Sequence, residues 1–200
     1  MNIESTQPPL HPSNVGAMSL ILAVLLLAAA PLILGQTHPP ARDYTDVPFV
    51  PTPPKLVDAM LAIADVKPGD VLIDLGSGDG RIVLAAVKKY GIHATGIEID
   101  PELVRESEKT AQELGVADKA RFINGDLFGQ DLRQASIVTV FLTPGVNLRL
   151  RPKLLKELKP GARVVSRTFN MGAWAPSKTV QIDNDRVYLW VIPDETPRSK

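Results

Sequence analysis

The chain carries the glycine-rich stretch Asp74-Leu75-Gly76-Ser77-Gly78-Asp79-Gly80 within a sequence of 200 residues. The apolar run Val71-Leu72-Ile73 precedes this stretch, and apolar residues at helical spacing follow it from Ile82 to Tyr90. A strand, a glycine turn and a helix in this order form a cradle for a ligand, because glycine allows close backbone approach and the helix start presents free N–H groups. The stretch therefore predicts a site for a nucleotide-like ligand at the end of a buried strand.

A second acidic residue stands where a ribose would be recognised. Glu98 lies about 20 residues beyond the glycine turn, after the apolar strand Ala94-Thr95-Gly96-Ile97, and a carboxylate there can accept hydrogen bonds from both ribose hydroxyls. The glycine spacing is not that of a dinucleotide site, since Arg81 or Val83 stands where G-x-G-x-x-G needs its third glycine. Asp74, two residues before the first glycine, suits a ligand with a cationic amine and would repel a pyrophosphate.

This pattern resembles motif I of the class I S-adenosylmethionine-dependent methyltransferases. In that resemblance Glu98 matches the ribose-binding acid, and Asp126, in Asn124-Gly125-Asp126-Leu127, matches the adenine-binding acid after the third strand. The resemblance implies S-adenosylmethionine as cofactor, with contacts from Asp74, Gly76, Ser77, Gly78, Gly80, Glu98, Ile99, Asp126 and Leu127. The alternative for Asp74 and Asp126 is an ordinary carboxylate that lies in a loop or caps a helix.

The proline-rich phrase Val47-Pro48-Phe49-Val50-Pro51-Thr52-Pro53 precedes the first predicted helix. Together with the glycine stretch it is similar to a narrower group, the lysine methyltransferases of the ATP synthase c subunit with their archaeal and bacterial relatives. The resemblance covers residues 44–192 and implies a protein lysine as methyl acceptor. It also implies that the segment from Phe49 to Thr52 folds over the methionine end of the cofactor. The alternative is that Phe49 anchors the first helix in the core.

Methyl transfer from a sulfonium requires no nucleophile from the protein, so the sequence leaves the catalytic residues open. Four residues are weak candidates for contact with the acceptor: Phe49, Thr52, Thr143 and Trp174. The phrase Phe141-Leu142-Thr143-Pro144 lacks the Asn/Asp-Pro-Pro-Tyr/Phe pattern of enzymes that methylate nucleobase or glutamine nitrogens. Phe169, Met171 and Trp174 could line a pocket for an alkyl-ammonium group, or could pack in the core. Thr143 could instead cap the following helix.

The composition narrows the classes of substrate and ligand. The 22 Lys and Arg residues balance the 22 Asp and Glu residues, which argues against a nucleic-acid substrate, for which a basic surface is the rule. The chain has no cysteine, and His11, His38 and His93 are scattered. We therefore expect neither a disulfide nor a catalytic metal. We also expect a monomer.

Residues 15–35 carry no charge and are mostly Leu, Ala, Ile and Val. A helix of about 21 residues spans roughly 31 Å, the thickness of a hydrocarbon core. The alternative, a cleaved signal peptide, would have Lys or Arg before the apolar run, where Glu4 stands instead. The sequence thus predicts a single-pass membrane protein with its catalytic domain on the cytoplasmic side. The predicted divisions are a tail (1–14), an anchor (15–35), a proline-rich linker (36–51), a methyltransferase domain (52–193) and a second tail (194–200).

Strands and helices alternate from residue 52 onward, which predicts an α/β fold, a doubly wound, mostly parallel, seven-stranded sheet. Thr52 is the predicted N-cap of the first helix, with Pro53 at its first position. The predicted strands are 70–75, 93–98, 120–123, 136–142, 163–166, 179–182 and 186–192, the last two forming a hairpin. A helix near 149–159 carries Arg149, Arg151, Lys153, Lys156 and Lys159, which indicates a solvated face or a contact with anionic lipid.

Three further functions compete with protein-lysine methylation. A small-molecule or lipid methyltransferase would share the cofactor and would also suit a membrane anchor. A nicotinamide-dependent oxidoreductase fits less well, because the glycine spacing differs and no Tyr-x-x-x-Lys pair or catalytic histidine is evident. A non-catalytic cofactor-binding scaffold stays open, since no obligatory catalytic side chain exists to be missing.

Overall fold

A computed structural model describes residues 48–194. The predicted N-terminal tail, the anchor at 15–35, the linker up to residue 47 and the C-terminal residues 195–200 lie outside this part of the chain. Within residues 48–194, no helix combines the length and the apolar character that crossing a membrane requires.

Five helical segments and seven strands alternate along the described chain. Their bounds are α1 (Pro54–Ile63), β1 (Val71–Leu75), α2 (Arg81–Tyr90), β2 (His93–Glu98), α3 (Pro101–Glu113), β3 (Ala120–Asn124), the 3₁₀ helix η1 (Leu127–Gly129), β4 (Ile137–Val140), α4 (Pro144–Glu157), β5 (Arg163–Arg167), β6 (Lys178–Ile182) and β7 (Asp185–Val191). The strands form one sheet in the order β3-β2-β1-β4-β5-β7-β6. The predicted doubly wound, seven-stranded sheet is confirmed.

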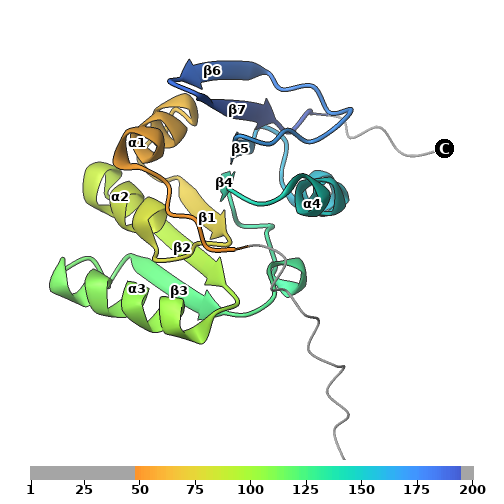
Figure 1. Cartoon of the computed structure of the whole chain (residues 1–200). Coiled ribbons are helices and arrows are strands. Elements are labelled where there is room, and N and C mark those ends of the chain that lie inside the picture. The colour runs from red at the N-terminus through yellow and green to blue at the C-terminus, as the bar shows by residue number, and fades with distance from the viewer. Residues whose placement is uncertain (1–47, 195–200) are drawn as a thin grey trace, which may run out of the picture. The chain divides into compact units, whose positions relative to one another are not determined.

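The first five strands run parallel, and β7 pairs antiparallel with both β5 and β6. In Figure 1, α1, α2 and α3 cover one face of the sheet, and α4 lies on the other. The chain winds outward from β1 through β2 to β3, and then returns to add β4 on the other side of β1. Ligands of such sheets bind at this reversal, outside the carboxyl ends of the strands. The fold therefore places the predicted cofactor site beside the ends of β1 and β4.

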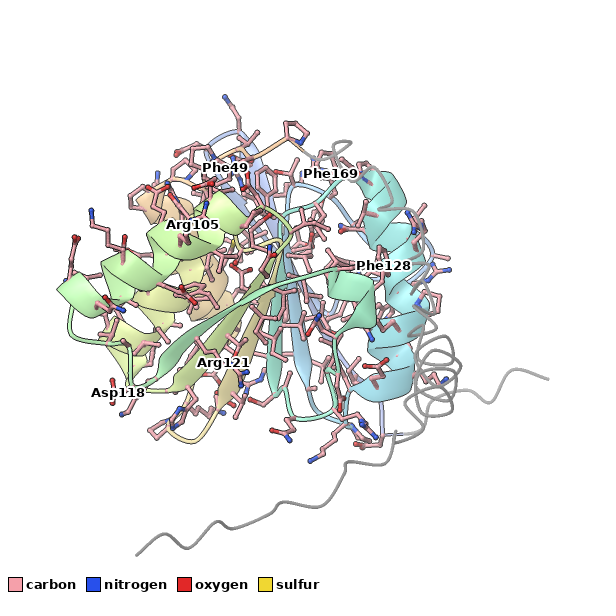
Figure 2. All side chains as sticks on the ribbon, turned by 90° about the horizontal axis from the view of Figure 1, so that it is seen from below. Phe49, Arg105, Asp118, Arg121, Phe128 and Phe169 are labelled. Atoms are coloured by element: carbon pink, nitrogen blue, oxygen red, sulfur yellow. The ribbon has the colours of Figure 1, made fainter. Side chains whose placement is uncertain are left out.

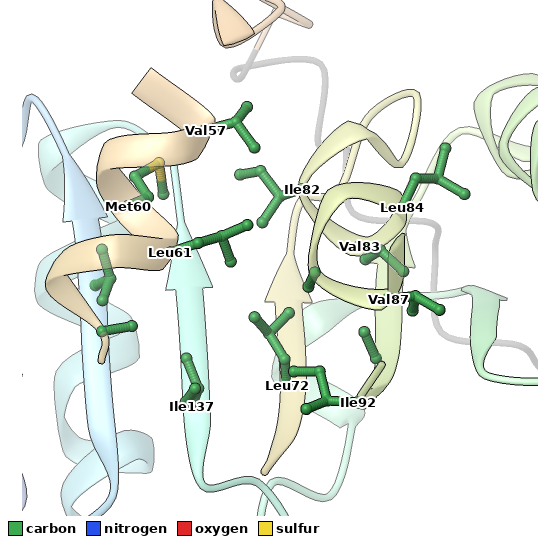
Figure 3. Close-up of a cluster of buried hydrophobic side chains, with 14 of the residues drawn as sticks. Val57, Met60, Leu61, Leu72, Ile82, Val83, Leu84, Val87, Ile92 and Ile137 are labelled. Carbon is green, nitrogen blue, oxygen red and sulfur yellow. The ribbon is translucent and has the colours of Figure 1, made fainter. Parts of the chain in front are cut away.

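Apolar residues of α1 and α2 meet above β1 and β4 (Figure 3). The buried side chains of this layer include Val57, Met60, Leu61, Leu72, Ile82, Val83, Val87 and Ile137. Burial of each Leu, Val or Ile side chain contributes about 1.5–3 kcal/mol relative to exposure. This layer fixes α2 on the sheet, and with it the glycine turn from which α2 begins.

The start of the first helix differs from the prediction. Pro53 is the N-cap and α1 begins at Pro54, without a side-chain capping bond. The prediction of Thr52 as N-cap is wrong because its side chain is buried and its hydroxyl instead accepts a hydrogen bond from Arg167 Nη1 at 3.4 Å. The fourth strand is also shorter than predicted: it ends at Val140, so residues 141–143 leave the sheet at its carboxyl edge.

Of the basic residues predicted to form a solvated face, Arg149, Lys156 and Lys159 are exposed, whereas Arg151 and Lys153 are partly buried. Arg149 stacks on the ring of Phe128, with its Cζ 4.6 Å from the ring centroid. Arg151 donates to the carbonyl of Met171 at 3.0 Å. The side chain of Lys153 is only 15% exposed and pairs with Glu157 at 2.7 Å. The charge pattern alone could not show this, because the contacts of Arg149 and Arg151 come from distant segments.

Candidate functional site

The glycine stretch forms a tight turn between β1 and α2. Gly78 has φ +55°, and a Cβ there would lie 2.3 Å from Cε2 of Phe49. A side chain here would be strained by the backbone angle and would have to displace the Phe49 ring, which lies directly against Gly78. The Phe49 side chain is 48% exposed, so the alternative in which it anchors the core is wrong. The proline-rich segment thus lies against the turn that the resemblance assigns to the cofactor.

Glu98, the predicted ribose acid, lies at the end of β2 and faces the turn. Its Oε2 accepts from the Gly78 N–H at 2.8 Å, and its Oε1 accepts from the N–H groups of Ile99 at 2.8 Å and Asp100 at 3.0 Å. A carboxylate has about four acceptor positions, so capacity remains for a ligand hydroxyl. The three backbone bonds hold Glu98 rigidly beside the glycine turn.

Asp74 is buried within β1, with 2% of its surface exposed. Its Oδ1 accepts from the hydroxyl of Thr139 on β4 at 2.7 Å. Burial raises the pKa of Asp74 to about 7, against the opposing effect of the Thr139 hydrogen bond, and the nearby Glu98 and Asp79 charges raise it further. Within residues 48–194 no cation pairs with Asp74. A ligand with a cationic amine would supply the missing charge.

Four further predicted contacts lie in the same turn, directly after β2, or after β3. The Ser77 hydroxyl is buried and has no hydrogen-bond partner in the described chain. Asp126 begins η1, and its Oδ1 accepts from the Phe128 N–H at 2.9 Å. Leu127 follows in η1, and Ile99 exposes 44% of its surface. An uncompensated carboxylate, an orphaned hydroxyl and exposed apolar surface fit S-adenosylmethionine, which offers an amine, hydroxyls and an adenine ring.

The site lies at the carboxyl edge of the sheet. Figure 2 shows Phe49 and Phe169 at one edge of the molecule, and Asp118 and Arg121 at the opposite edge. Phe169 follows the end of β5, whereas Arg121 lies near the start of β3. Phe49 therefore lies at the edge where the parallel strands end, as the reversal in strand order requires.

The weak acceptor candidates separate into two groups. Phe49 and Thr52 lie together against the glycine turn, and Arg81 donates to the Thr52 carbonyl at 2.8 Å. Thr143 is the N-cap of α4, but its side chain makes no capping bond. Trp174 packs against Trp190 with ring centroids 5.7 Å apart, and its carbonyl accepts from the Trp190 indole. The contacts of Trp174 are those of a core residue, and its contact with an acceptor stays a prediction.

Sequence reasoning missed several polar residues at this edge. Thr139 is fully buried, and its hydroxyl holds Asp74. Arg167 pairs with Asp185 on β7 at 3.2 Å, and its Cζ lies 4.1 Å from the centroid of the Phe141 ring. The sequence contained one signal for the contact between Asp74 and Thr139, since Thr139 is the only polar residue of β4. No three His, Asp or Glu side chains within residues 48–194 come together in a group that could hold a metal ion.

Comparison with known families identifies the domain. The family model for the ANTKMT methyltransferase domain matches residues 74–178. A protein-lysine N-methyltransferase of Saccharolobus islandicus is 44% identical over 73% of this chain and 94% of its own length. The human lysine N-methyltransferase of the ATP synthase c subunit is 35% identical, over 90% of this chain and 77% of its own length.

A solved structure supports the same assignment. A crystal structure described as an RNA methyltransferase from Salinibacter ruber, in complex with S-adenosyl-L-homocysteine, is 53% identical with a TM-score of 0.73. The match covers 75% of this chain and 98% of that protein. Identity at this level across nearly the whole of a cofactor-bound structure supports S-adenosylmethionine as the cofactor here. The chain belongs to the ANTKMT methyltransferase family and is an S-adenosylmethionine-dependent methyltransferase.

Proposed function

We propose that this protein transfers a methyl group from S-adenosylmethionine to the amine of a protein lysine. The observation that carries the proposal is the match to the archaeal protein-lysine N-methyltransferase, which covers 94% of that relative's length. That relative therefore has little beyond the domain shared with this chain. The mouse adenine nucleotide translocase lysine N-methyltransferase is also 37% identical over 88% of this chain.

RNA is the second candidate acceptor, because the Salinibacter protein is described as an RNA methyltransferase. Two observations favour lysine. The formal net charge of the chain is zero, whereas RNA binding draws on clustered basic residues. At the carboxyl edge, Arg81 and Arg167 are already paired with Asp79 and Asp185. These two arginines are therefore not free to pair with a phosphate backbone.

The chemistry asks little of the protein beyond binding and alignment. When bound, S-adenosylmethionine supplies the electrophilic methyl group. Asp74 and Glu98 would hold its amine and ribose, and Phe49 would keep water away from the glycine turn. A lysine must be neutral to accept a methyl group, which costs about 4.6 kcal/mol at pH 7 for a free side chain. Loss of solvent at the site lowers this cost, because burial favours the neutral amine.

We further propose that residues 15–35 are retained as a membrane anchor and that the catalytic domain acts as a monomer on the cytoplasmic side. The uncharged run of the sequence supports the anchor. The match to the human relative covers 90% of this chain and must therefore extend into the residues before 48. Alkaline carbonate extraction tests the anchor: release of all the protein into the supernatant would contradict it. Light scattering of the detergent-solubilised protein tests the monomer.

The acceptor is tested by incubating the full-length protein with tritiated S-adenosylmethionine and a membrane extract, with total RNA in a parallel reaction. We expect label in protein, and mass spectrometry should place it on lysine. The control is Glu98→Ala, which should label nothing. Label that enters RNA or lipid, and not protein, would replace lysine with the corresponding acceptor.

A further inference from the structure

A series of hydrogen bonds and ion pairs links five polar residues across the carboxyl edge, from the glycine turn to the β6–β7 hairpin. Asp79 accepts from Arg81 Nε at 2.8 Å, and Arg81 Nη1 donates to the Thr52 carbonyl at 2.8 Å. On the other side of Thr52, its hydroxyl accepts from Arg167 Nη1 at 3.4 Å, and Arg167 Nη2 pairs with Asp185 at 3.2 Å. Two guanidinium groups from distant segments thus converge on one residue that is 5% exposed.

Arg167 lies near one end of this series, and several contacts hold the turn that follows it. Thr168 has φ +66°, an uncommon backbone angle for a β-branched residue. The Phe169 N–H donates to the Arg167 carbonyl at 2.7 Å, which closes a three-residue turn. The Thr168 hydroxyl donates to Asp185 at 2.8 Å, and Asn147 donates to the Phe169 carbonyl at 3.2 Å. A strained turn persists only where surrounding contacts hold it. The contacts of Thr168 and Phe169 therefore keep this turn in place, and with it the adjoining Arg167.

Arg81, near the other end of this series, directly follows the glycine turn. Arg81 is the first residue of α2 and follows Gly80 of the turn. Three residues before Thr52, Phe49 lies against Gly78. The segment 49–52 is otherwise exposed at Phe49, Val50 and Pro51, so it has few apolar contacts of its own to keep it in place. The two hydrogen bonds to Thr52, the burial of that residue and the contact of Phe49 with Gly78 attach this segment to the domain.

We propose that Thr52 and Arg167 are positioning residues that fasten the segment 49–52 over the bound cofactor and so set its residence time. The Thr52 hydroxyl joins this segment to the turn after β5, and the Thr52 carbonyl joins it to α2. The arrangement couples the cofactor turn to the strand ends where an acceptor arrives. This role requires only S-adenosylmethionine as cofactor, and it is independent of which acceptor the enzyme uses.

The test measures the release of tritiated S-adenosylhomocysteine from the full-length protein into excess unlabelled compound. In Thr52→Val, which removes only the hydroxyl, we expect release about five times faster and an unchanged association rate. Thr52→Ser restores the hydroxyl and should release the ligand at the wild-type rate. Thr110→Val is the matched control, because its hydroxyl bonds only within α3, to the Glu106 carbonyl.

Arg167→Met should also speed release, and adding Thr52→Val to it should not speed release further, because Arg167→Met already removes the bond to the Thr52 hydroxyl. Equal release from Thr52→Val and Thr52→Ser, or additive effects in the double variant, would overturn the proposal. If Thr52→Val fails to fold, Phe49→Ala and Arg167→Lys carry the test. Phe49 is half exposed, and a lysine cannot reach both Thr52 and Asp185 with a planar fork. Wild-type release in both of these variants would overturn the proposal.

Discussion

The carboxylates at the two ends of β1 have opposite electrostatic environments. Asp70, just before the strand, forms an ion pair with Arg163 and accepts hydrogen bonds from the Ser136 hydroxyl and the Lys67 N–H, both at 2.7 Å. Asp74, within the strand, has only the Thr139 hydroxyl. Within the described residues, the chain itself compensates the charge of Asp70 and leaves that of Asp74 without a cationic partner. A binding site differs from a structural network in that its partner comes from outside.

The comparison also separates stability from function. A buried ion pair that loses one partner is strongly destabilising, since an uncompensated charge remains. A buried acid without a cationic partner should respond in the opposite way. Its replacement by a neutral residue should stabilise the protein, because the cost of burying the charge is removed. Substitutions at the two edges should therefore move stability and cofactor affinity independently of each other.

The largest effect is expected from Glu98→Ala. This variant would lose a bond to a ribose hydroxyl, worth roughly 1.5–3 kcal/mol when charge-assisted, and also the three backbone bonds that hold the glycine turn beside β2. Affinity for S-adenosylhomocysteine should fall by at least 100-fold in isothermal titration calorimetry. Glu113→Ala, which changes an exposed acid of α3, is the control and should bind as the wild type does. Unchanged affinity in Glu98→Ala would falsify the ribose assignment.

Arg163→Met addresses the amino edge. Arg163 and Asp70 have side chains only 17% and 10% exposed, so we expect the free energy of unfolding to fall by about 3–5 kcal/mol in urea titrations. Cofactor affinity of the folded variant should not change. Arg105→Met removes an exposed pair with Glu102 on α3 and should cost less than about 1 kcal/mol. Loss of cofactor binding in folded Arg163→Met would show that the two edges are not independent.

Asp74→Asn should weaken S-adenosylhomocysteine binding about 10- to 100-fold, the value of one charge-assisted hydrogen bond. The same variant should stabilise the ligand-free protein. Because the folded pKa of Asp74 is raised to about 7, the folded state holds the proton more tightly, and stability falls as pH rises from about 4 to 7. The gain in Asp74→Asn should therefore reach up to about 4 kcal/mol at pH 8 and vanish toward pH 4. Ligand-free melting curves at both pH values measure it.

The smallest effect concerns the pH dependence of binding in the wild type. A cationic amine binds the ionised form of Asp74, so affinity should decline below about pH 7, by at most tenfold per pH unit. Calorimetry at pH 5.5 and pH 8 should show this decline in the wild type and not in Asp74→Asn. The same decline in both proteins would assign the titration to another group.

The cofactor side of the site was predictable because its spacing is local. The turn from Asp74 to Gly80 and the acid at Glu98 each lie within one strand–turn–helix unit. Asp100 is the N-cap of α3, with its carboxylate accepting from the Glu102 N–H at 2.8 Å. The doubly wound sheet and its terminal hairpin followed from the alternation of elements and from the methyltransferase resemblance.

The contacts that join distant segments were not predictable. Asp74 and Thr139 are 65 residues apart, and Thr52 and Arg167 are 115 residues apart. A single sequence contains periodicity and turn signals, but it does not show which residues face each other across strands that are not neighbours in sequence. The prediction of Thr52 as the N-cap of α1 failed for this reason. Its hydroxyl accepts a hydrogen bond from the distant Arg167 and does not cap the helix.

The Asp74–Thr139 bond has a consequence for how the sheet assembles. All four residues of β4 are buried, so this strand lacks the alternation of polar and apolar faces that fixes the alignment of an ordinary strand. Its neighbour β1 pairs Asp74 directly with Thr139. A shift of β4 by one position would set Val138 or Val140 opposite the acid, and would bury a carboxylate with no donor at all. The threonine that donates to Asp74 thereby also gives β4 one preferred alignment.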